Sequence, residues 1–127
     1  MKYTYTFDQL RETDDNVHRL FMCLEATVQH FNAVDLSRYY TADHGVVEAP
    51  DPQTACELLF RMYNMDERPA GYTGRSMSVS DVVNLWDNTV DPPKKSTWFC
   101  DSIGFKLLEI SASQAGGHYA ENVPDPI

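Results

Sequence analysis

Apolar residues recur at the spacing of a β-strand in some segments of the chain and at the spacing of an α-helix in others. They alternate with polar residues over 2–7 and 79–86, and they follow helical spacing over 17–31 and 55–63. A strand buries residues i and i+2, whereas a helix buries residues i, i+3 and i+4. The sequence therefore predicts an α+β fold, with a mostly antiparallel sheet of about four to six strands and two packed helices.

The boundaries of these elements follow from capping and turn residues. The second helix is predicted over about residues 52–64, because Asp51-Pro52 places an N-cap acid before a first-turn proline. Acids after Thr13 predict a first helix over about residues 14–31. The remaining expectations are an edge strand over 2–7, a hairpin within 36–48 that turns at Ala42-Asp43-His44-Gly45, strands over 81–86 and 97–101, and a strand or short helical turn over 105–110.

A chain of 127 residues has room for one domain of ordinary size. We expect this domain to cover residues 1–112 and residues 113–127 to form a flexible tail, because glycine, proline and polar residues dominate there. No apolar run approaches the ~20 residues that cross a bilayer, and no signal segment opens the sequence. The expected location is the cytoplasm, without a membrane partner.

The charge is strongly acidic, with 19 Asp and Glu against 10 Lys and Arg and a net charge of -9. Nucleic-acid binders gain affinity from Lys and Arg, so direct binding to nucleic acid is not expected. Solubility is one explanation of the acidity. The alternative is an acidic mimic of nucleic acid that inhibits a restriction or CRISPR nuclease.

Residue types that can act in catalysis or bind metal are present, but they do not occur at the spacings of known catalytic or metal-binding motifs. Cys100, Asp101, His44 and His118 are separate candidates for nucleophilic chemistry, and no Gly-x-Ser-x-Gly occurs. The three cysteines include no C-x-x-C pair, so we expect reduced thiols. We therefore assign no catalytic, cofactor-binding or metal-binding residue and expect no cofactor. An undetected hydrolase remains an alternative.

Aromatic residues in the predicted strands and loops are candidates for contact with a protein partner, although the same residues could fill the core. The candidate contact residues are Tyr72, Arg75, Trp86, Trp98 and Phe99.

The predicted loop after the second helix contains Ser and Asp residues, whose side chains can hydrogen-bond to nearby backbone groups. It also contains glycine, which adopts backbone conformations that other residues avoid. We expect Gly74, Ser78, Ser80, Asp81 and Gly104 to shape turns and strand starts, with Asp81 accepting backbone N–H groups. The alternative is that this loop presents a binding epitope.

Three stretches occur together in residues 55–110: LLFRMYN at the end of the second helix, PAGYTGRSMSVSDVVNL after it, and WFCDSIGF near the end. In this order they resemble the YodL-like domain family of Gram-positive bacteria. The resemblance implies an accessory role on a mobile genetic element and carries no enzymatic activity. The resulting hypothesis is a non-enzymatic module that binds a host or element-encoded protein, with its oligomeric state left open.

Overall fold

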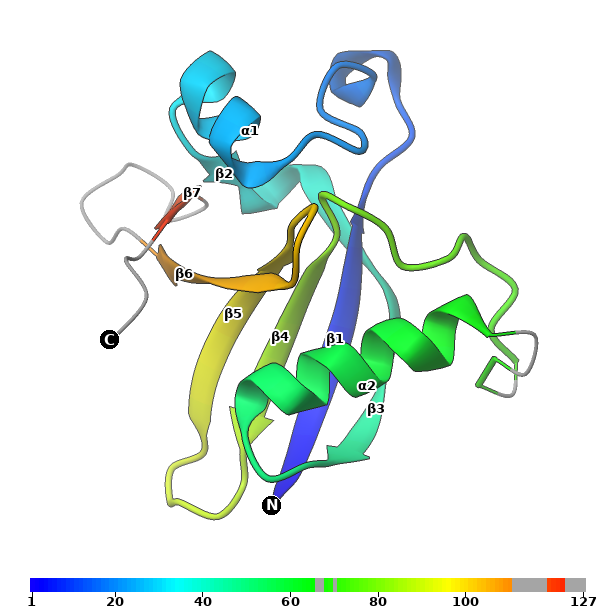
Figure 1. Ribbon diagram of the computed structural model, residues 1–127, viewed down its shortest axis with the longest axis vertical. Coiled ribbons are helices and arrows are strands. Elements are labelled where there is room, and N and C mark those ends of the chain that lie inside the picture. Colours follow the sequence, from blue (N-terminus) through cyan, green and yellow to red (C-terminus); the bar gives the residue numbers. More distant parts are fainter. Residues whose placement is uncertain (66–67, 70, 111–118, 123–127) are drawn as a thin grey trace.

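The structure, a computed structural model, describes residues 1–65, 68–69, 71–110 and 119–122. Figure 1 shows one sheet with a long helix across one face and a short helix at one end. The elements in chain order are β1 (Lys2–Leu10), η1 (Asp14–Asn16), α1 (Leu24–Phe31), β2 (Val34–Asp35), η2 (Leu36–Arg38), β3 (Tyr39–Glu48), α2 (Pro52–Asn64), β4 (Val82–Asp87), β5 (Lys94–Cys100), β6 (Phe105–Ile110) and β7 (Tyr119–Asn122), where η denotes a 3-10 helix.

The seven strands form one sheet in the order β2-β7-β6-β5-β4-β1-β3, with antiparallel pairs throughout. Strands β6, β5, β4, β1 and β3 are the long ones, whereas β2 has 2 residues and β7 has 4. The predicted α+β fold with an antiparallel sheet and two α-helices is confirmed. The short strands β2 and β7 extend the sheet beyond its five long strands.

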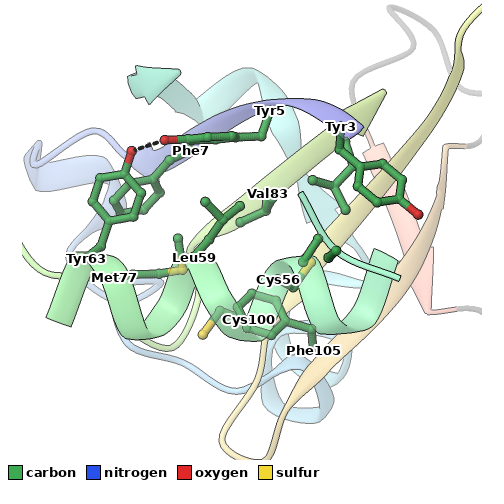
Figure 2. Packing of buried hydrophobic residues seen from close by; sticks show 13 residues of the cluster. Tyr3, Tyr5, Phe7, Cys56, Leu59, Tyr63, Met77, Val83, Cys100 and Phe105 are labelled. Atoms are coloured by element: carbon green, nitrogen blue, oxygen red, sulfur yellow. Dashed lines mark hydrogen bonds between the residues drawn. The ribbon is translucent and has the colours of Figure 1, made fainter. Parts of the chain in front are cut away.

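Helix α2 covers one face of the sheet and is confirmed with the predicted bounds. The Asp51 carboxylate accepts the Thr54 N–H at 2.7 Å, which caps the helix, and Pro52 occupies its first turn. Figure 2 shows Leu59 and Tyr63 of α2 packed against the strand side chains. The buried cluster on this face contains Tyr3, Tyr5, Phe7, Ala49, Ala55, Cys56, Leu59, Tyr63, Met77, Val83, Leu85, Cys100 and Phe105.

Helix α1 begins at Leu24, so the prediction of a helix from residue 14 is wrong. Phe21 has φ 62°, in the left-handed region that interrupts a helix, and its N–H donates to Ser80 Oγ at 3.1 Å. The Leu24 N–H at the helix start donates to Asp101 Oδ1 at 3.1 Å. Distant residues therefore fix the start of α1. The helix packs on a second cluster, on the sheet face opposite α2, with Leu10, Leu24, Val34, Tyr39, Val82, Phe99 and Leu108.

Strand β3 runs without a turn from Tyr39 to Glu48, so the predicted hairpin is wrong. Its turn-forming residues have other roles. The Asp43 carboxylate accepts the Tyr63 hydroxyl at 2.7 Å and the His44 N–H at 2.9 Å. Gly45 lies under the Tyr5 ring, where a Cβ atom would be 3.1 Å from the ring. The register shifts opposite Phe7 and Asp8, which marks a β-bulge in β3.

Strand β1 pairs with both β3 and β4, so its predicted edge position is also wrong. The alternation of aromatic and polar residues identified its two faces and not its neighbours. On the polar face, Asn84 donates to Asp8 Oδ2 at 2.9 Å and to Thr6 Oγ1 at 3.0 Å. Hydrogen bonds between strands thus satisfy polar side chains on one face of this interior strand.

Part of the predicted tail belongs to the sheet. Strand β7 pairs Asn122 with Leu108 of β6 and Ala120 with Val34 of β2. Residues 111–118 and 123–127 lie outside the described residues. Within the described part of the chain, neither helix combines the length and apolar character that a bilayer crossing needs.

Candidate functional site

A groove of about 900 Å³ opens beside the N-terminus of α2, over Trp98 of β5 and Leu107 of β6. Its volume lies in the range of small-molecule pockets. Its apolar walls come from four separate segments: the start of β1, the residues around the start of α2, β5 and β6. The apolar lining residues are Met1, Tyr3, Pro50, Pro52, Trp98, Leu107 and Leu108.

Trp98 is the predicted contact residue that lines this groove. It lies in β5 opposite Val83 on one side and Leu107 on the other, on the face that carries α2. The side chain is half-buried, and its Nε1–H donates to Ser96 Oγ at 2.9 Å. Because the only polar atom of the indole has a partner, the exposed part of the ring is suited to apolar contact.

Charged side chains surround the apolar walls. Hydrogen bonds from the Thr54 backbone and side chain lower the pKa of Asp51, and hydrogen bonds from the Thr89 side chain and backbone lower the pKa of Asp87. Both carboxylates therefore stay ionised in mild acid. Lys94, which lies opposite Asp87 in the β4–β5 pairing, adds positive charge to the same rim.

The two other aromatic candidates from the predicted strands lie elsewhere. Phe99 is 0% exposed in the cluster under α1, so its assignment as a contact residue is wrong. The alternation of residues in β5 could not show that α1 covers the face that carries Phe99. Trp86 is half-buried on the face opposite α2, with Lys95 Nζ 5.4 Å from its ring centroid.

Tyr72 and Arg75 hold the loop after α2 against the domain. The Tyr72 ring packs against Phe7 and Tyr63 at centroid distances of 5.9 and 5.0 Å, and its hydroxyl donates to the Arg75 carbonyl. The Arg75 guanidinium lies 3.5 Å from Asp81 Oδ1 and 5.1 Å from the centroid of the Phe21 ring. These contacts support a structural role for both residues.

Asp81 fixes the start of β4 from a fully buried position. Its Oδ2 atom accepts the Ser78 N–H at 2.8 Å and lies 3.4 Å from Gln9 Nε2. Burial raises the pKa of Asp81 to about 6, although the hydrogen bond from Ser78 and the Arg75 charge act in the opposite direction. The bond to Ser78 is the backbone contact that the sequence analysis expects of this carboxylate.

The other predicted turn residues surround the same end of the sheet. Ser80 has φ 85° and Gly104 has φ 69°, both in the left-handed region. At Gly74, a Cβ atom would lie 2.7 Å from the Tyr72 hydroxyl, so glycine permits that ring to approach the backbone.

Comparison with protein families finds a match to the YodL-like domain over residues 4–110. The chain belongs to the YodL-like domain family. The match extends from β1 to the end of β6 and includes the N-terminal part that the three sequence stretches left out. No curated protein and no solved structure gives a significant match.

The thiols of this YodL-like domain are free, and two of them are buried. Cys100 is 2% exposed, and burial raises the pKa of its thiol to about 12. Cys100 is therefore a protonated core residue in neutral solution. The described residues contain no group of three or more His, Cys, Asp or Glu side chains placed to hold a metal ion.

Sequence reasoning found Trp98 but missed the rest of the groove in the YodL-like domain. Tyr3 had a predicted face, and Pro52 had a predicted helix position, yet no local pattern places either beside Leu107. Their proximity depends on the strand order, which the sequence analysis left open. The aromatic residue in the predicted strand over 97–101 was the signal that could be used.

Proposed function

We propose that this YodL-like domain is a non-enzymatic interaction module, an accessory protein of a mobile genetic element that acts in the cytoplasm. Its groove binds an apolar segment of a host or element-encoded protein. The observation that carries the proposal is the position of Trp98, half-buried in a groove of about 900 Å³ with its indole N–H already bonded.

Tryptophan in a partly closed pocket is the side chain that most often dominates binding energy at protein interfaces. Here Leu107 lies beside Trp98 in the sheet, and Tyr3 lines another part of the same groove. A charged rim around an apolar centre is also the common composition of such interfaces. The groove thus supports desolvation of an apolar side chain, with Asp51, Asp87 and Lys94 selecting the flanking charges.

The net charge of -9 favours a protein partner over nucleic acid. Affinity that depends on desolvation changes little with salt, whereas occupation of a cationic nucleic-acid groove weakens steeply as salt rises. Salt dependence therefore separates the proposal from an acidic inhibitor of a nuclease.

The test is capture of the partner from the source cell by the wild-type domain and by two matched variants. Trp98→Ala removes the indole from the groove, and Trp86→Ala removes an indole from the opposite face. We expect Trp98→Ala to reduce capture at least about tenfold at both low and high salt, and Trp86→Ala to leave it near the wild-type level. Thermal unfolding of each variant verifies that it is folded.

Two results would overturn the proposal. In one, Trp86→Ala and Trp98→Ala reduce capture equally. In the other, added DNA competes with the partner and capture disappears as salt rises, which would identify a nucleic-acid mimic.

A further inference from the structure

We infer that the second half of β3 pairs with the same segment of a second copy of this chain, which joins two sheets edge to edge. Strand β3 is the last strand on its side of the sheet, next to β1 (Figure 1). The segment concerned is residues 44–48, which follow the bulge in β3. This site is separate from the groove, and the inference does not depend on the proposed function.

Backbone hydrogen bonds show which groups of β3 point away from β1. The Ala49 N–H donates to the Met1 carbonyl at 2.9 Å, and the Asn88 N–H, beyond β4, is 3.5 Å from the Lys2 carbonyl. Backbone groups alternate in direction along a strand, so odd-numbered residues of β1 face β3 and even-numbered ones face β4.

The partners of these odd-numbered residues are Val47, opposite Tyr3, and Gly45, opposite Tyr5. Their N–H and C=O groups are directed at β1. The backbone groups of His44, Val46 and Glu48 therefore point outward. Among the described residues, no strand pairs with this side of β3.

The outward segment is complementary to itself. If a two-fold axis passes through Val46, antiparallel pairing places Val46 opposite Val46 of the second copy. It also places His44 opposite Glu48 of the second copy, twice by symmetry. Val46 is 65% exposed, so pairing buries an apolar side chain from each copy. The two His44–Glu48 pairs beside it join side chains of complementary polarity.

Hydrogen bonds can form along this register without changing the fold. Each Val46 N–H donates to the Val46 carbonyl of the other copy, and each Glu48 N–H donates to the opposite His44 carbonyl. The His44 N–H contributes less, because Asp43 Oδ1 already accepts it at 2.9 Å. The bulge ends the regular pairing at this point, so we expect a short interface and a weak dimer.

The test is the oligomeric state of the full chain by sedimentation equilibrium, from about 1 µM to about 1 mM, the range in which a small interface dissociates. We expect a concentration-dependent dimer for the wild type. Val46→Lys should weaken dimerisation by about tenfold or more, because symmetry introduces the change twice. Val90→Lys is the matched control, since Val90 is 47% exposed in the loop between β4 and β5.

A charge exchange tests the register. His44→Glu alone and Glu48→Lys alone should each weaken the dimer, and the double variant should restore it. Hydrogen exchange at the Val46 and Glu48 amides should slow as the protein concentration rises. A wild type that is monomeric at every concentration would overturn the inference, as would a dimer that Val46→Lys leaves unchanged or the double variant does not restore.

Discussion

Replacing Asp81 with asparagine should change how the free energy of unfolding depends on pH. The Asp81 side chain is 0% exposed, and Arg75 lies 3.5 Å from Oδ1, too far for a strong hydrogen bond. The carboxylate charge is therefore incompletely compensated, and burial raises its pKa from the usual 3.8 to about 6. Asparagine keeps an oxygen for the Ser78 N–H and removes the titrating group.

The sign follows from proton binding. The folded protein binds the Asp81 proton more tightly than the unfolded chain does, so protonation stabilises the fold. This stabilisation is fully present below about pH 3.8 and is lost as the pH rises through about 6. A difference of about 2 pKa units corresponds to about 3 kcal/mol.

Urea denaturation at steps from about pH 4 to about pH 7, followed by tryptophan fluorescence, measures the effect. The free energy of unfolding of the wild type minus that of Asp81→Asn should fall by about 2.4 kcal/mol over this range, because part of the full effect lies below about pH 4. Taking the difference cancels other carboxylates, including Asp8, whose pKa burial also raises. A difference that stays constant would refute the reasoning and show that the Arg75 ion pair offsets burial, and a difference that rises with pH would show that the ion pair outweighs it.

Two further substitutions test how the elements are held. Gly45→Ala should lower the free energy of unfolding by roughly 1–3 kcal/mol, because the new Cβ would lie 3.1 Å from the Tyr5 ring; an unchanged urea midpoint would show that the ring moves freely. Asp101→Ala should cost about 1 kcal/mol and speed hydrogen exchange in α1, because Asp101 accepts the Leu24 N–H, whereas the exposed neighbour change Ser102→Ala should have little effect; equal exchange rates would contradict this role.

The elements that could be predicted from the sequence are those with local causes. Helix α2 has its cap, its proline and its apolar spacing within one segment, and its predicted bounds are confirmed. Helix α1 has its start defined by Ser80 and Asp101, which are distant in the sequence. The apolar residues before Leu24 satisfy helical spacing, but the left-handed conformation of Phe21 interrupts it.

Turn residues in β3 misled the prediction for a related reason. Asp, His and Gly in succession favour a turn when they have no tertiary partners. In the fold, Asp43 binds the Tyr63 hydroxyl and Gly45 accommodates the Tyr5 ring, so tertiary contacts decide the conformation. The candidate site follows the same rule: Trp98 could be proposed from local sequence, whereas its neighbours depend on strand order.

The position of β1 between β4 and β3 constrains when the domain can fold during synthesis. Strand β1 leaves the ribosome before the other strands of this sheet, and one of its two neighbours, β4, follows only after β3 and α2. Until then β1 and β3 form at most a two-stranded ribbon, which is marginally stable in water. Tyr3, Tyr5 and Phe7 therefore remain without their full packing until α2 and β4 to β6 have been synthesised. The nascent chain depends on late-arriving residues to cover its most aromatic surface, the interval in which chaperones recognise exposed apolar segments.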